Sequence, residues 1–338
     1  MSISTVTDHG DVNDVSDGPP AGTAGIEFTE ITESGPSLAA RLVSGAARMT
    51  VHNAVAAGYH ALGLPLPFGV IERAAHALPA PQGLVRSRVT LPHAHAELIR
   101  ARGVARRTGR VVLYLHGGAF LCCGIGTHLR LIDNLSKCAD SPVLAVDYRM
   151  LPKHTIPMAL DDCRDAYRRL REHGYEADQI VISGDSAGGY LALALAQLLL
   201  RDGERPAALT LLSPLLQLAG ERPPVDGPML PHNAFAALTA LIAAHDGALY
   251  EPLDHITPGL PPTLIHVSGS EELAHDARLV VRKLADAGVS AQLVSWPGQV
   301  HVFQLAAPVV PEATRSLRGI GAYIRAAVPQ RRRSTQVA

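Results

Sequence analysis

The chain has 338 residues, of which 47% are hydrophobic and 18% are charged. This composition supports a sizeable core and excludes a chain disordered throughout, a coiled coil and a charge-rich tail protein. Thirty basic residues against 31 acidic ones give a formal net charge of −1, so we expect no nucleic acid partner and no anionic membrane partner. The length permits one large domain or two modest ones. The longest apolar runs, at 190–200 and 234–244, are too short to span a membrane.

The N-terminal part divides into two segments. Residues 1–36 are rich in Asp, Gly, Ser and Thr, and we expect them to be disordered. Residues 37–80 show apolar residues at helical spacing, but prolines break the apolar stretch 62–71, so it cannot form one regular helix. Two interpretations of 37–80 stay open: a helical cap or lid over an apolar site, and a segment packed onto the main core.

From residue 81 to residue 327, short apolar runs alternate with amphipathic segments. This alternation predicts an α/β domain with a mostly parallel sheet and helices on both faces. We expect strands at Arg86–Thr90, His95–Ala101, Val111–Leu115, Val143–Val146, Ile180–Ile182, Leu209–Leu212, Leu264–Val267 and Gln292–Trp296, and helices at Met158–Glu172, Ala187–Arg201 and Ala274–Ala287. The Pro-rich residues 217–260, with one helix at Asn233–His245, predict an insertion at the mouth of a site. Residues 328–338 form a basic tail.

The strongest motif is the GDSAGG block at 184–189, between an expected strand and an expected helix. It fits Gly-x-Ser-x-Gly in the strand–turn–helix context of a nucleophile elbow. Such a turn lifts the hydroxyl of Ser186 above the sheet edge, beside the N-terminus of the next helix. Ser186 is therefore the candidate nucleophile, and Asp185 is expected to anchor the turn rather than react. The Lys of a phosphate-binding Walker loop is absent.

An HGGAF block at 116–120 follows the expected strand Val111–Leu115. Acyl transfer passes through a tetrahedral oxyanion, which needs preorganised hydrogen-bond donors. Consecutive glycines let backbone amides approach closely because no Cβ is in the way. The amides of Gly117 and Gly118, together with that of Ala187 on the elbow, are therefore predicted to form an oxyanion hole.

A serine hydroxyl needs a base before it can attack, and imidazole titrates in the right range. His301 lies in the loop after the last expected strand, where the base belongs in the chain order Ser, acid, His. The acid that orients it is expected after the strand Leu264–Val267, where Glu271 and Glu272 stand side by side. The pattern alone does not select one of them.

Four cysteines, at 122, 123, 138 and 163, form no CxxC pair and no Cys/His cluster with zinc spacing. A disulfide between the adjacent Cys122 and Cys123 would be strained, and both are interpreted as small packing residues. We therefore expect reduced thiols, no metal and a cytoplasmic location. The beginning of the chain shows no secretory signal pattern.

Together these blocks resemble the hormone-sensitive-lipase branch of the α/β-hydrolases, mainly microbial carboxylesterases and lipases. The resemblance covers roughly residues 85–325 and includes the Asp147-Tyr148-Arg149 segment followed by Pro152. It implies an α/β-hydrolase fold with an N-terminal helical cap at 37–80. The family's acid is usually an Asp in an Asp-Pro-Leu-like block. Here the block reads Glu271-Glu272-Leu273, and matching its leucine puts the acid at Glu271.

The resemblance implies a serine carboxylic-ester hydrolase for hydrophobic, short- to medium-chain acyl esters. Its triad would be Ser186, His301 and Glu271, with an oxyanion hole of Gly117, Gly118 and Ala187, and it would use no cofactor. Two alternatives stay open: an amidase or peptidase with the same triad, and a non-catalytic ligand receptor on a hydrolase scaffold. The expected partner is a small-molecule ester, and a homodimer through an edge strand is a further option.

Overall fold

The computed structural model describes residues 2–3, 28–52, 69–225, 234–246 and 250–329. These residues form a ten-stranded sheet in the order β1-β2-β10-β9-β8-β7-β5-β6-β4-β3. The seven strands β2, β10, β9, β8, β7, β5 and β6 each run parallel to their neighbours in this series. The β1–β2, β6–β4 and β4–β3 pairs are antiparallel. The strands are β1 Ser2–Ile3, β2 Thr29–Thr32, β3 Val85–Thr90, β4 His95–Arg100, β5 Val111–Leu115, β6 Val143–Asp147, β7 Ile180–Asp185, β8 Ala208–Leu212, β9 Thr263–Ser268 and β10 Ala291–Trp296. The mostly parallel α/β architecture agrees with the prediction.

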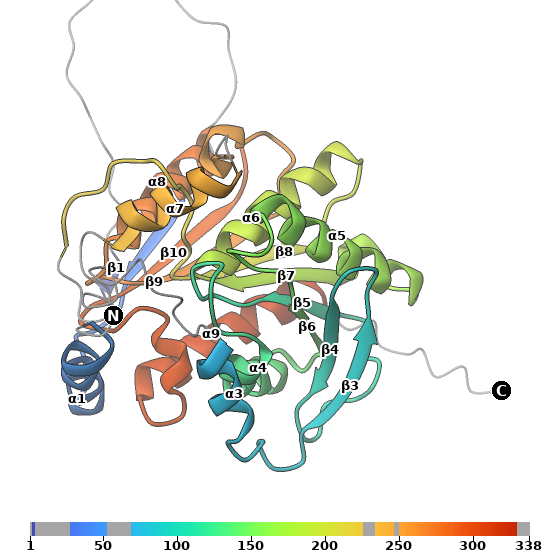
Figure 1. Cartoon of the computed structure of the whole chain (residues 1–338), viewed down its shortest axis with the longest axis horizontal. Coiled ribbons are helices and arrows are strands. Elements are labelled where there is room, and N and C mark those ends of the chain that lie inside the picture. The colour runs from blue at the N-terminus through green and yellow to red at the C-terminus, as the bar shows by residue number, and fades with distance from the viewer. Residues whose placement is uncertain (1, 4–27, 53–68, 226–233, 247–249, 330–338) are drawn as a thin grey trace, which may run out of the picture.

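Helices cover both faces of the sheet, with α5, α6 and α8 on one side and α4 and α9 on the other (Figure 1). They are α4 Ile125–Ala139, α5 Ile156–Glu172, α6 Ala187–Arg201, α8 Leu273–Asp286 and α9 Pro311–Ala327. Strands β5, β7, β8 and β9 are buried at every position, and they are rich in apolar residues because both of their faces are covered. In β5, for example, Val111, Leu113 and Leu115 belong to one hydrophobic cluster and Val112 and Tyr114 to the other.

The strands and helices expected between residues 81 and 327 are all present, and their ends differ from the prediction by at most three residues. The helix expected at Asn233–His245 is α7, Ala234–Asp246, and position 233 lies outside the described residues. Helices α4 and α9 and strands β1 and β2 were not expected. No helix in the described part of the chain combines the length and the apolar character that a membrane span requires.

Part of the N-terminal segment is ordered, contrary to the disorder expected for residues 1–36. Strand β2 pairs in parallel with β10, from Thr29 opposite Gln292 to Thr32 opposite Ser295. Glu30 also lies 3.2 Å from the guanidinium of Arg278 on α8. The edge of β10 would otherwise present unpaired backbone groups, and β-branched Thr and Ile side chains suit a strand there. Residues 4–27 lie outside the described part of the chain.

The first helix of the expected cap, α1 Leu38–Ala47, is anchored to the C-terminal part of the chain. Its N-cap residue Ser37 donates from its backbone N and its Oγ to the carboxylate of Glu312 on α9, at 2.7 and 2.9 Å. Ser44 donates from Oγ to the carbonyl of Gly298 at 3.1 Å. Because Gly298 precedes His301 by three residues, α1 lies against the loop that carries the candidate base.

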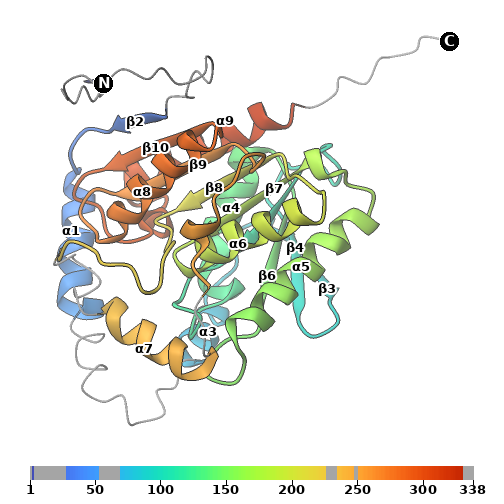
Figure 2. The same cartoon turned by 90° about the horizontal axis from the view of Figure 1, so that it is seen from above.

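A second helix of this segment, α3 Gly69–His76, packs on α4. Its Glu72 accepts the backbone amides of Gly126 and Thr127 at 2.6 and 3.0 Å, where a carboxylate is favoured by the helix dipole. Helices α1, α3 and α7 lie along one side of the molecule (Figure 2). Residues 53–68 lie outside the described part, and the lid function stays a prediction.

The expected insertion 217–260 is tied to α8 by a buried ion pair between Arg222 and Asp276, at 2.8 Å. It contains α7 and a short 3-10 helix, Pro252–His255. The expected tail begins later than predicted, because Val328 is buried and its carbonyl accepts Nη1 of Arg110 at 2.6 Å. Residues 330–338 lie outside the described part.

Candidate active site

The turn between β7 and α6 holds Ser186 at φ 51° and ψ −121°. This conformation is costly for a residue with a Cβ, and such strain is concentrated at functional sites. Backbone hydrogen bonds fix the turn: the amide of Ser186 donates to Leu212 O at 3.0 Å, and that of Gly189 donates to Ser186 O at 2.9 Å. A Cβ at Gly188 would lie 2.0 Å from Leu115 O, so only glycine lets α6 approach β5. The strand–turn–helix agrees with the motif, and it leaves Ser186 partly exposed between buried neighbours.

The HGGAF loop lies directly beside this elbow. A Cβ at Gly117 would be 3.0 Å from the Cβ of Ser186 and 2.3 Å from Oδ2 of Asp185. The amide of Gly117, predicted to be an oxyanion donor, donates instead to Oδ1 of Asp185 at 3.0 Å. The prediction for Gly117 is therefore wrong for this structure, because the carboxylate below the loop already occupies its N–H.

The peptide group that joins Gly118 to Ala119 makes hydrogen bonds through its carbonyl only. The carbonyl of Gly118 accepts the amides of Leu121 and Cys122 at 2.9 and 3.0 Å and the thiol of Cys122 at 3.4 Å. In a planar trans peptide, the N–H of Ala119 points opposite to this carbonyl. Within the described residues, the amides of Gly118, Ala119 and Ala187 make no hydrogen bond. Ala187 is the first residue of α6, and the first amides of a helix have no partner within it.

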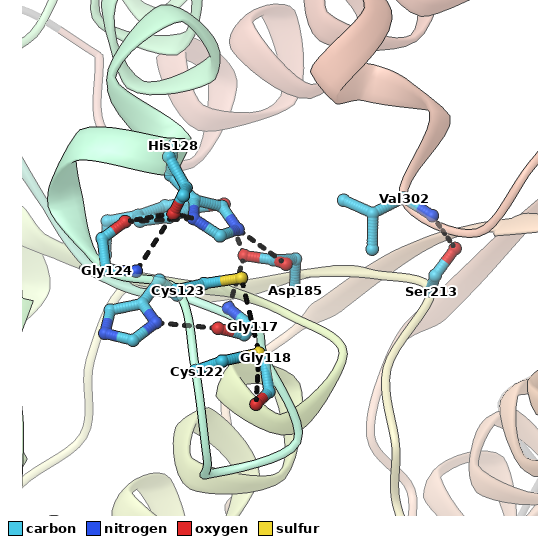
Figure 3. A network of polar contacts seen from close by, with 12 residues as sticks. Gly117, Gly118, Cys122, Cys123, Gly124, His128, Asp185, Ser213 and Val302 are labelled. Carbon is cyan, nitrogen blue, oxygen red and sulfur yellow. Dashed lines mark hydrogen bonds and ion pairs between the residues drawn. The ribbon is translucent and has the colours of Figure 1, made fainter. Parts of the chain in front are cut away.

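Asp185 is the centre of a buried polar network (Figure 3). Its Oδ1 accepts the hydroxyl of Tyr114 at 2.6 Å and the amide of Gly117, and its Oδ2 faces Nε2 of His128 at 3.2 Å. Nδ1 of His128 lies 3.0 Å from Gly124 O, so both ring nitrogens can donate, as in an imidazolium. Asp185 anchors the elbow as predicted, but no motif indicated His128 as its partner.

Electrostatics favour the charged forms of Asp185 and His128. Burial disfavours the His128 cation, but the charge of Asp185 and its hydrogen bond outweigh burial and raise the pKa of His128 to about 9. Burial likewise disfavours the Asp185 anion, but the charge of His128 and the hydrogen bonds from His128 and Tyr114 lower the pKa of this carboxyl. Burial and the nearby His128 cation lower the pKa of His116 to about 4, so His116 is neutral. At neutral pH the elbow is therefore anchored by the buried ion pair between Asp185 and His128.

We expect His128 to make the free energy of unfolding depend on pH above neutrality. Its pKa is raised from 6.5 to about 9, so its contribution is complete below pH 6.5 and is lost as pH rises through about 9. The shift corresponds to about 3 kcal/mol. Urea unfolding of wild type and His128→Gln between pH 6 and 10 should show a stability gap that narrows at alkaline pH. His93→Gln, on an exposed turn, is the control, and a gap independent of pH would contradict the charged pair.

The loops after β9 and β10 bring a carboxylate to His301. Oε2 of Glu271 lies 2.5 Å from Nδ1 of His301, and each side chain is only 7% exposed. Oε1 of Glu271 accepts the amide of Ser268 at 3.0 Å, and the hydroxyl of Ser268 donates to Gln299 O at 2.7 Å, so one serine ties the two loops together. The adjacent Glu272 accepts the amide of Val225 at 3.5 Å. Of the two glutamates, Glu271 is the one that contacts His301.

Residues at the end of β8 connect the His301 loop to the elbow. Leu212 O accepts the amide of Ser186, and Oγ of the next residue, Ser213, accepts the amide of Val302 at 3.3 Å (Figure 3). Ser186 and His301 therefore lie at the same sheet edge. Oγ of Ser186 and Nε2 of His301 make no hydrogen bond within the described residues. Such contacts are often long in enzymes without substrate.

The candidate groups all follow the carboxyl ends of neighbouring parallel strands. The HGGAF loop follows β5, Ser186 follows β7, Ser213 follows β8, Glu271 follows β9 and His301 follows β10. Because parallel strands end at one edge of a sheet, residues from more than half of the chain meet there. No sequence pattern indicated Ser213 or His128, since their importance comes only from contacts between distant segments.

Comparison with known proteins identifies the family. Residues 112–305 match the family described as the alpha/beta hydrolase fold. The chain is 56% identical over 313 residues to the carboxylesterase/phospholipase LipF of Mycobacterium tuberculosis, covering 88% of this chain and 84% of LipF. It is 58% identical over 295 residues to the esterase LipU of the same species, covering 82% and 99%. A solved esterase of the bacterial hormone-sensitive lipase family has 29% identity and a TM-score of 0.75, covering 87% and 100%. The chain therefore belongs to the α/β-hydrolases, in the hormone-sensitive-lipase-like branch of carboxylesterases.

Proposed function

We propose that this protein hydrolyses carboxylic esters with Ser186 as nucleophile, His301 as base and Glu271 as the acid that orients the base. The observation that carries this proposal is the 2.5 Å contact of Glu271 with Nδ1 of His301, at the sheet edge where Ser186 stands in a strained turn. A carboxylate on Nδ1 stabilises the tautomer whose Nε2 can accept the serine proton. The esterase names of the similar proteins favour an ester substrate.

The oxyanion hole is proposed to consist of the amides of Gly118, Ala119 and Ala187. Gly118 and Ala187 keep the roles expected from the sequence, and Ala119 replaces Gly117. This replacement is supported by the Gly117–Asp185 hydrogen bond and by the donors that hold the carbonyl of Gly118. Ala119 and Phe120 adopt φ values of 55° and 60°, which a loop maintains only when its surroundings enforce them.

In the proposed reaction, Oγ of Ser186 attacks the ester carbonyl while Nε2 of His301 takes its proton. The three amides bind the negative charge on the carbonyl oxygen, and His301 then protonates the leaving alcohol. Water repeats the steps on the acyl-enzyme and releases the acid. The route uses neither a metal nor an organic cofactor.

The proposed substrates are esters with hydrophobic acyl chains of short to medium length. Large apolar side chains are exposed on the cap segment, at Leu38, Leu42, Met49 and Ile71, and these suit an apolar ligand. A cytoplasmic location and a homodimer remain predictions.

A series of p-nitrophenyl esters from acetate to palmitate, with matching p-nitroanilides, tests this function. We expect kcat/KM to be highest for short to medium acyl chains and to fall for palmitate, because the family resemblance implies an acyl site of limited depth that would not accept the longer chain. The anilides should react much more slowly than the esters. Comparable anilide turnover would favour the amidase alternative. Ligand binding without any turnover would favour the receptor alternative.

A further inference from the structure

The HGGAF loop leads into two adjacent cysteines that the proposed reaction does not use. The sulfur atoms of Cys122 and Cys123 lie 3.7 Å apart, and both residues are partly exposed. In an extended strand, adjacent side chains point to opposite faces. Here Cys123 adopts φ 69°, and the turn brings the two thiols together beside Gly118 (Figure 3). Two thiols fixed in this way can bind one atom jointly, which a single thiol cannot do.

The sulfur separation fits a shared atom better than a disulfide. An atom that binds two sulfurs at about 2.3 Å each holds them about 3.3 Å apart when the angle is a right angle and about 3.8 Å apart when it is tetrahedral. Trivalent arsenic is pyramidal, with angles between these limits, and the observed 3.7 Å lies within this range. A disulfide would require the sulfurs to approach to about 2.05 Å within two adjacent residues.

We propose that Cys122 and Cys123 form a dithiol site for a trivalent arsenical, and that its occupation inactivates the esterase. An oxide of the form R–As=O reacts with both thiols. Two S–H bonds break, two As–S bonds form, and the oxygen leaves as water with the two protons. Arsenic stays trivalent, so the step consumes no oxidant and no reductant.

The same thiols are coupled to the proposed oxyanion hole. Sγ of Cys122 donates to Gly118 O at 3.4 Å, and this carbonyl belongs to the peptide group that carries the N–H of Ala119. Arsenic binding removes the thiol hydrogen from this carbonyl and closes a new ring over Cys122 and Cys123. The proposed coupling is that this ring shifts the loop and withdraws the N–H of Ala119 from the oxyanion. Loss of one oxyanion donor reduces kcat by about 10²- to 10³-fold in a well-studied protease. This inactivation rests on the proposed function, whereas binding of the arsenical does not.

Phenylarsine oxide is the probe, and intact-protein mass measurement and p-nitrophenyl butyrate turnover are the two readouts. We expect one phenylarsenic group per wild-type chain and a fall in kcat of about 10²-fold or more. The dithiol 2,3-dimercaptopropanol should reverse both effects, whereas 2-mercaptoethanol should not. Cys122→Ser and Cys123→Ser should each bind the probe about 10²- to 10⁴-fold more weakly, since the second attachment is lost. Cys138→Ser, which removes a partly exposed single thiol, should behave like wild type.

Equal binding of the probe by wild type and by either Cys122→Ser or Cys123→Ser would overturn the site. An adduct mapped to Cys122 and Cys123 that leaves kcat unchanged would overturn the coupling to the oxyanion hole. If the wild-type protein lacked esterase activity altogether, the proposed function would fail. The mass readout would still test the dithiol site, so the two failures are distinguishable.

Discussion

Ser186→Ala should reduce kcat for p-nitrophenyl butyrate by about 10⁴- to 10⁶-fold, with little change in melting temperature. The hydroxyl is the proposed nucleophile, and no other group at the elbow can replace it. Its removal costs no structural hydrogen bond, because the Ser186 side chain does not cap α6. The turn itself is held by backbone contacts with Leu212 and by the glycines on either side. Residual activity is expected from the oxyanion hole and substrate binding alone.

Ser183→Ala is the matched control for this experiment. Ser183 lies three residues earlier on β7, and its buried hydroxyl has no hydrogen-bond partner in the described part of the chain. The control should keep activity close to wild type. This result would show that removing a nearby serine hydroxyl is not by itself enough to abolish turnover. Turnover by Ser186→Ala at the wild-type rate would remove Ser186 from the mechanism.

Glu271→Gln should lower kcat by about 10⁴-fold, as the loss of the orienting carboxylate does in serine proteases. A neutral amide next to Nδ1 no longer selects the tautomer that exposes Nε2, and it does not stabilise the imidazolium that forms during attack. Glu272→Gln is the matched control, because it makes the same change one residue away, at a side chain that accepts Val225 N, whereas Glu271 is the residue in contact with Nδ1 of His301. This variant should stay within a few-fold of wild type.

The comparison of the two glutamate variants needs kcat and melting temperature for each protein. A loss of kcat that occurs only in Glu271→Gln, in a folded protein, supports the proposed orienting role. Equal and mild losses in both variants would show that neither carboxylate orients His301.

The fold class and the elbow are predictable because they depend on local chemistry. Apolar runs separated by amphipathic helices specify buried parallel strands, and the observed ends of these elements lie close to the expected ones. The sharp turn of the GDSAGG block requires glycine at 184 and 188, because a Cβ at either position would collide with backbone atoms. The position of Ser186 therefore follows from a few adjacent residues. The unexpected β2 shows the limit, since a short polar segment becomes a strand only when β10 supplies its partner.

The sequence by itself determined the α/β architecture, the serine at the elbow and a glutamate doublet that precedes a histidine. The family resemblance favoured Glu271 over Glu272, but only the tertiary structure brought the Glu271 carboxylate to Nδ1 of His301, assigned the amide of Gly117 to Asp185 and paired Asp185 with His128. These features depend on the distances and directions of atoms from segments far apart in the chain. A sequence pattern records which residues are available, but hydrogen bonds and ion pairs form only where the packed sheet brings their atoms within about 3 Å.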